Sequence, residues 1–108
     1  MIKLKLLKID GISMHPALES GAFVLVWRWE IGRYRQQVQV GDIVAVRHSY
    51  YGEIIKRVSQ VRLDNNGQAI ALRLCGDNAA ASVTEVQMGW IMLEQVIGKV
   101  VCVVRAST

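Results

Sequence analysis

A chain of 108 residues has room for one domain with a single hydrophobic core, and no composition break divides it, so residues 1–108 are predicted to form one domain. Hydrophobic residues make up 52% of the chain, yet no run approaches the ~20 apolar residues that cross a bilayer. The formal net charge is +4, but the basic residues are scattered, which argues against a nucleic-acid partner.

The chain is predicted to be built from short strands. Residues 2–9 alternate lysine with aliphatic residues, which is typical of a strand and not of an export signal, so we expect a cytoplasmic protein or one peripheral at a membrane surface. Residues 30–41 are polar and aperiodic and are predicted to form a surface loop. Further runs rich in Val, Ile and Leu cover residues 22–29, 42–48, 53–63, 69–75 and 95–105. The pattern predicts an all-β fold of antiparallel strands.

Two turns have recognisable chemistry. One short helical turn is predicted from Met14 to Ser20, because Pro16 suits the first turn of a helix and Gly21 suits a stop. The segment from Asp64 to Gly67 ends in Asn-Gly, which accepts the positive φ angles of tight hairpin turns. Residues 53–63 and 68–74 should therefore pair as an antiparallel hairpin.

The two cysteines predict neither a disulfide nor a metal site. Cys75 and Cys102 lie in apolar, strand-like contexts and have no Cys or His at the spacing of metal ligands. We expect reduced thiols in the core and no metal.

Four short motifs follow one another along the chain, and a serine at position 82 follows the last. They read Gly-Ile-Ser-Met-His-Pro at 11–16, Gly-Asp-Ile-Val at 41–44, Ile-Lys-Arg-Val at 55–58 and Gly-Asp-Asn at 76–78. Each alone is typical of an ordinary turn, strand or loop. Their order resembles the boxes of the signal peptidase I family from Ile9 to Val101, and LexA-type self-cleaving repressors share the first three boxes more loosely.

This resemblance implies a signal-peptidase/LexA-like catalytic core and a serine endopeptidase without metal or organic cofactor. Ser13 matches the nucleophile, Lys56 the general base and Ser82 the hydroxyl that hydrogen-bonds the lysine. Asp42 and the pair Asp77-Asn78 match structural positions of the family.

The chemistry has independent requirements that these residues meet. A serine hydroxyl needs an adjacent base, and a lysine serves as one when burial lowers its pKa. Strand alternation places Lys56 on one face with Ile54 and Val58, an apolar setting of that kind. Two histidines remain as alternative bases: His15 lies on the turn of Ser13 without an evident acidic partner, and His48 begins a loop.

The sequence also departs from the family pattern. Ala17 stands where the family has threonine, and Thr84-Glu85-Val86 replaces an Asp-Ser-Arg group, so the acid/arginine ion pair expected there is lost. Gly11 occupies the position where some signal peptidases have a hydroxyl that helps stabilise the oxyanion. The backbone N–H of Ser13 is therefore our first candidate for an oxyanion donor.

We expect the substrate to be a protein or peptide bound as an extended strand, and a leader or signal-type bond to be cleaved in trans. Gly11, Met14 and Trp27 are the predicted substrate contacts. On the strand of Trp27, the side chains of Phe23 and Leu25 are expected to pack in the core, whereas Trp27 and Trp29 suit a groove about as well as the core.

Two alternatives share this fold. One is a non-catalytic peptide-binding module, which the lost Asp-Ser-Arg group favours and the retained Ser13 and Lys56 oppose. The other is a repressor-derived regulatory domain that forms a homodimer through Gly98 to Arg105.

Overall fold

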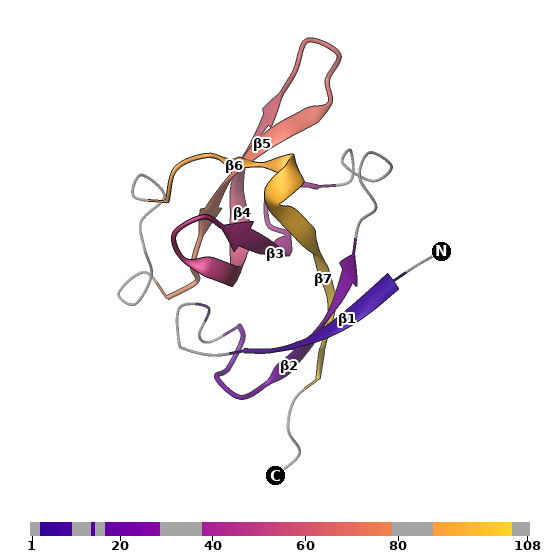
Figure 1. Ribbon diagram of the computed structural model, residues 1–108, viewed down its shortest axis with the longest axis vertical. Coiled ribbons are helices and arrows are strands. Elements are labelled where there is room, and N and C mark those ends of the chain that lie inside the picture. The colour runs from indigo at the N-terminus through magenta and orange to yellow at the C-terminus, as the bar shows by residue number, and fades with distance from the viewer. Residues whose placement is uncertain (1–2, 10–13, 15–16, 29–37, 79–87, 105–108) are drawn as a thin grey trace.

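The computed structural model describes residues 3–9, 14, 17–28, 38–78 and 88–104, and most of this backbone lies in β-strands (Figure 1). The strands are β1 (Lys3–Lys8), β2 (Phe23–Arg28), β3 (Ile43–His48), β4 (Gly52–Leu63), β5 (Ala69–Cys75), β6 (Ile91–Met92) and β7 (Val96–Val104), and the 3-10 helix η3 (Leu93–Gln95) precedes β7. The described part of the chain is therefore all-β, as the sequence predicts.

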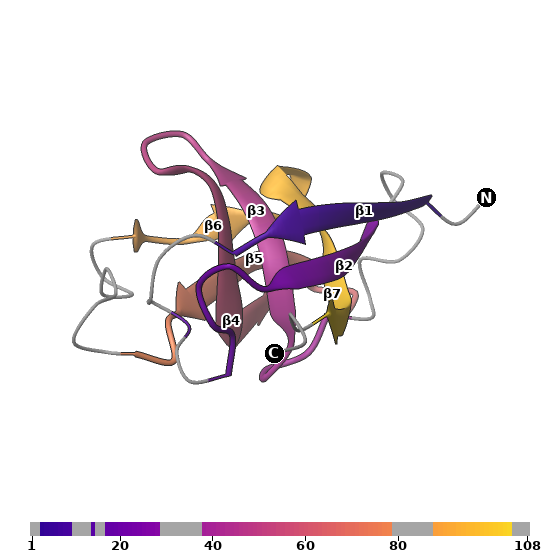
Figure 2. The same cartoon turned by 90° about the horizontal axis from the view of Figure 1, so that it is seen from below.

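The seven described strands form one sheet in the order β1-β2-β7-β3-β4-β5-β6, and every neighbouring pair is antiparallel. The last strand, β7, lies between β2 and β3 and joins the β1–β2 hairpin to the rest of the sheet (Figure 1). Register shifts interrupt the β2–β7, β3–β7 and β4–β5 pairings. Such irregularities bend and twist strands, and the sheet is coiled (Figure 2). Both of its faces bury side chains.

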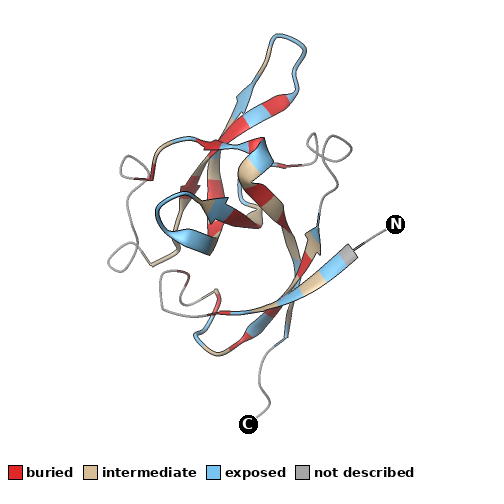
Figure 3. Cartoon of the chain, viewed as in Figure 1, coloured by how far each residue is buried: buried red, intermediate tan, exposed pale blue. Residues whose placement is uncertain are grey.

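Apolar side chains gather in two clusters because alternate residues of a strand point to opposite faces. On β3, Val44 and Val46 belong to one cluster and Ala45 to the other. Along β2 the buried positions alternate with less buried ones, whereas β3 has three buried residues in a row, since both of its faces are covered (Figure 3). The first apolar cluster comprises Val38, Val44, Val46, Val58, Ala69, Leu72, Leu74, Met88, Ile91, Leu93 and Val96, and the second comprises Ile9, Met14, Leu18, Val24, Val26 and Ala45.

The β4–β5 hairpin confirms the predicted pairing and the reverse turn at residues 64–67, where Gly67 N–H donates to Asp64 O at 3.1 Å, but only one of the Asn-Gly residues has positive φ. Of the residues described, only glycines have positive φ, so Gly67 (φ 79°) adopts the left-handed conformation and Asn66 does not. The Asp64 carboxylate instead accepts hydrogen bonds from the backbone N–H groups of Asn66 (2.8 Å) and Gln68 (2.9 Å). An aspartate at the start of a turn commonly bonds the backbone in this way, and here it accepts from two N–H groups of the connection between β4 and β5.

The six predicted strands are confirmed, whereas two short elements were missed. The two residues of β6 and the three of η3 carry too little periodic pattern to be recognised. In the segment predicted as a helical turn, Leu18 N–H donates to Met14 O at 2.9 Å, so a hydrogen-bonded turn is present, and residues 15–16 lie outside the described residues.

Three burial predictions were wrong. Val38 is buried in the first apolar cluster although it lies in a segment predicted as a surface loop. The buried face of β2 is formed by Val24 and Val26, so Phe23 is 39% exposed instead of packing in the core. Cys102 is an exposed free thiol because it lies on the outer face of β7.

Candidate active site

Lys56 is the one buried charged residue among those described, with 6% of its surface exposed. It lies on β4 opposite Val44 of β3, and its neighbours two positions away, Ile54 and Val58, pack in or against the first apolar cluster. Burial lowers the pKa of the Lys56 amine, because the charged form loses its hydration, and the nearby Cys75 thiol offsets part of this effect. The amine is thus closer to its neutral form at neutral pH than a solvated lysine would be.

The next residue, Arg57, ties β4 to the segment that follows β5. Its Nε donates to Asp77 Oδ1 at 2.7 Å and its Nη2 donates to Asp77 Oδ2 at 2.8 Å, a bidentate pair. Its Nη1 donates to Gly41 O at 2.8 Å. The hydrogen bond from Arg57 lowers the pKa of Asp77, which is therefore ionised at neutral pH. The sequence motifs did not reveal this pair, although Arg57 lies in the third motif and Asp77 in the fourth.

Asp42 lies directly before β3, and its side chain makes contacts that hold this turn in place. Its Oδ2 accepts a hydrogen bond from Gln39 N–H at 2.9 Å, and its Oδ1 lies 3.3 Å from Lys99 Nζ. The same turn is hydrogen-bonded to β4, because Gly41 N–H donates to Val58 O and Val58 N–H donates to Asp42 O. The Gly-Asp-Ile-Val motif thus holds the start of β3 against the strand that carries Lys56.

The connection between β1 and β2 is closed at its base. Ile9 N–H donates to Ala22 O at 2.7 Å, and Gly21 N–H donates to Ile9 O at 2.8 Å. Met14 (3% exposed) and Leu18 (1% exposed) anchor the connection in the second apolar cluster. The predicted nucleophile Ser13, like Gly11 and His15, lies outside the described residues.

The last motif lies beside this connection. Figures 1 and 2 both show residues 17–22 and residues 76–78 on the same side of the molecule. Ser82, predicted to orient the lysine, lies outside the described residues, and so does Glu85 in the altered motif. The fold therefore brings the described flanks of two predicted site segments to one side.

His48, one of the alternative bases, has both ring nitrogens engaged. Its Nδ1 accepts hydrogen bonds from the backbone N–H groups of Tyr50 (3.0 Å) and Tyr51 (3.1 Å), and its Nε2 lies 3.3 Å from Met88 O. An unprotonated Nδ1 leaves the ring proton on Nε2, where it bonds the carbonyl. His48 therefore holds the tip of the β3–β4 hairpin.

Trp27 is half-buried on β2, on the face opposite Val26, and Trp29 lies outside the described residues. Within the part of the chain described, no group of three or more His, Cys, Asp and Glu residues is arranged to hold a metal ion. No helix among the same residues combines the length and apolarity needed to span a membrane.

The chain matches the model of one protein family. The family model described as signal peptidase, peptidase S26, matches residues 1–73, which include the first three motifs. A search of curated proteins found no match.

Proposed function

Because the chain belongs to the signal peptidase family, peptidase S26, we propose that it is a serine endopeptidase with Ser13 as nucleophile and Lys56 as general base. The observation that carries this proposal is the burial of Lys56, which lowers the pKa of its amine. A neutral amine accepts a proton from a serine hydroxyl, whereas a solvated lysine is protonated at neutral pH and does not.

In the proposed reaction, Ser13 Oγ attacks the carbonyl carbon of the scissile bond while its proton passes to Lys56 Nζ. The resulting ammonium donates that proton to the leaving nitrogen, so the C–N bond breaks and an acyl-enzyme remains. Water, deprotonated by the same amine, then hydrolyses the ester and regenerates Ser13. The backbone N–H of Ser13 stabilises the oxyanion, and the hydroxyl of Ser82 orients the amine.

The Arg57–Asp77 pair supports this assignment of roles. Arg57 directly follows Lys56, and Asp77 begins the short segment that leads to Ser82. A bidentate ion pair between them restrains the lysine strand against that segment, so the acid/arginine brace lost at Thr84-Glu85-Val86 has a counterpart here.

The proposed substrate is a leader or signal-type segment of another protein, bound as an extended strand and cleaved in trans. Gly11, Met14 and Trp27 are its proposed contacts. Because the side chain of Met14 is buried, that residue would meet the substrate through its backbone groups. Trp27 would supply partly exposed aromatic surface from β2.

Co-expression with candidate leader-bearing proteins tests the proposal. Wild-type protein should shorten a cognate substrate at its N-terminus, and Ser13→Ala and Lys56→Ala should each reduce cleavage by about 10⁴-fold or more. Lys8→Ala, which removes an exposed lysine of β1, is the control and should leave cleavage unchanged. Mass spectrometry of the substrate reads out both the reaction and the bond.

The pH profile tests the base. Cleavage should rise with pH through the folded-state pKa of Lys56 and then level, because only the neutral amine accepts the proton. A rise through about pH 4 to 5 would instead indicate a carboxylate base such as Asp42. If the substrate has the same mass after co-expression with wild type and with Ser13→Ala, and both proteins bind the peptide, the protein is a peptide-binding module and not an enzyme.

A further inference from the structure

A cavity of about 460 Å³ lies at one end of the second apolar cluster, and nothing in the proposed peptidase chemistry uses it. Val96 and Ile97 of β7 are among the residues that line it. Glu53 of β4 forms an ion pair with Lys5, which lines the cavity, and therefore marks the position of the cavity along β4. Arg57 lies four residues further along the same face of β4, a distance of about 13 Å along the strand. The cavity is therefore separate from the Arg57–Asp77 pair.

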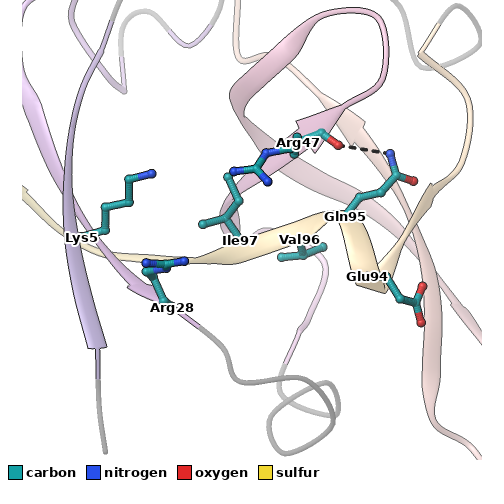
Figure 4. Close-up of a pocket in the computed structure, with 7 residues that line it drawn as sticks. All are labelled: Lys5, Arg28, Arg47, Glu94, Gln95, Val96 and Ile97. Carbon is teal, nitrogen blue, oxygen red and sulfur yellow. Dashed lines mark hydrogen bonds between the residues drawn. The ribbon is translucent and has the colours of Figure 1, made fainter.

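Three cationic side chains reach this cavity from three different strands, namely Lys5 of β1, Arg28 of β2 and Arg47 of β3 (Figure 4). Each lies two positions along its strand, on the same face, from an apolar residue that belongs to the second cluster or packs against it, which for Lys5 is Leu7. Arg28 follows Val26 by two positions, and Arg47 follows Ala45 by two. The inner face of each strand thus changes from apolar to basic at the same end.

The two arginines lack anionic partners within the described part of the chain. The ion pairs formed there are Lys5–Glu53 (3.2 Å), Arg57–Asp77 and Lys99–Asp42, and none of them includes Arg28 or Arg47. Glu94 also lines the cavity, but Figure 4 shows its carboxylate directed away from both guanidinium groups.

The remaining polar lining residue, Gln95, is held by the protein itself. Its Nε2 donates to Arg47 O at 3.2 Å, and its Oε1 accepts from Met92 N–H at 2.9 Å. The side chain of Gln95 therefore fixes the wall of the cavity and is not a free acceptor for the arginines. Like charges that converge on one cavity repel each other, and a bound anion removes that cost.

We propose that this cavity binds a phosphate-class anion, either a free phosphate ester or the phosphate of a lipid headgroup. Guanidinium groups present planar pairs of donors that match phosphate oxygens, and Arg28 and Arg47 supply two such groups with Lys5 beside them. The volume exceeds what a bare phosphate needs, and the side chain of Ile97, which packs against the second apolar cluster, offers apolar surface to an attached carbon chain. The proposal does not depend on the peptidase function.

Calorimetric titration of the full chain with inorganic phosphate tests the anion site. The double variant Arg28→Gln/Arg47→Gln should weaken phosphate binding by about tenfold or more. Because neither arginine has an ion-pair partner among the described residues and their mutual repulsion is removed, the Tm of this variant without phosphate should be equal to or slightly above that of wild type. The control Lys8→Gln/Arg62→Gln removes the same charge from exposed positions outside the cavity and should bind as wild type does.

Co-sedimentation with vesicles distinguishes the two sources of phosphate. Vesicles of phosphatidylcholine alone are compared with vesicles that also contain phosphatidylglycerol. If the protein binds the anionic vesicles through its arginines and does not measurably bind inorganic phosphate, the ligand is a lipid headgroup. If it binds inorganic phosphate through its arginines and does not bind the anionic vesicles, the ligand is a free phosphate ester. The proposal fails if neither probe binds, or if the control variant loses binding as much as the cavity variant does, since the effect would then be one of net charge.

Discussion

Breaking the Arg57–Asp77 pair should destabilise the protein, and the structure sets the size of the effect. The variant Asp77→Asn keeps the shape of the side chain but removes its charge and one acceptor, so one of the two hydrogen bonds, at 2.7 and 2.8 Å, is lost. The side chains of Arg57 and Asp77 are 32% and 18% exposed, so the pair lies between a surface ion pair and a buried one. We expect a loss of about 1.5 kcal/mol in the free energy of unfolding.

A double-mutant cycle isolates this interaction. Arg57→Gln should cost more than Asp77→Asn because it also removes the hydrogen bond to Gly41 O. The coupling energy between the two substitutions, measured by urea unfolding, should be about 1–2 kcal/mol. Glu53→Gln is the matched control, since the Lys5–Glu53 pair has one contact and each side chain is more than a third exposed, and it should cost at most about 0.5 kcal/mol.

The pH dependence has a defined sign. Because Arg57 lowers the folded-state pKa of Asp77, the pair stabilises the protein fully above the unfolded-state pKa of about 3.9. That stabilisation is lost as pH falls through the folded-state value, so the difference between wild type and Asp77→Asn should shrink in acid. A coupling below about 0.3 kcal/mol, or a difference that stays constant from neutral pH into acid, would refute the reasoning.

Three further predictions concern stability. Lys56→Met removes, at nearly constant volume, a buried amine whose charged form burial disfavours, and should raise the free energy of unfolding by about 1 kcal/mol or more at pH 7. Because the folded-state pKa of Lys56 is lowered, this gain should shrink as pH rises towards about 10.4, and a gain unchanged at alkaline pH would contradict the assignment. Gly98→Ala should cost about 3 kcal/mol or more in thermal unfolding, since the new Cβ would overlap the carbonyl group of Trp27; an unchanged Tm would show that β2 and β7 are not so close. Gly67→Ala should cost about 1 kcal/mol in urea unfolding, because φ at this position is +79°, and an unaffected midpoint would argue against the described turn.

The local pattern of the sequence was enough to predict where the strands lie and that Lys56 is buried. Runs of Val, Ile and Leu between turn residues predicted six strands correctly, because strand formation depends on neighbours along the chain. Alternation around Lys56 predicted its burial, since Ile54 and Val58 share its face and an apolar face turns inward. The Ser13/Lys56 dyad and the role of Ser82 stay predictions, because both serines lie outside the described residues.

Features that depend on strand order were decided only by the tertiary structure. Both faces of β2 are apolar, so alternation alone did not reveal that Val24 and Val26 face inward and Phe23 outward. The Arg57–Asp77 pair crosses the β4–β5 hairpin, and only the folded structure shows that these two side chains meet. The convergence of Lys5, Arg28 and Arg47 arises because β7 inserts between β2 and β3, and no local pattern records which strand a distant strand will pair with.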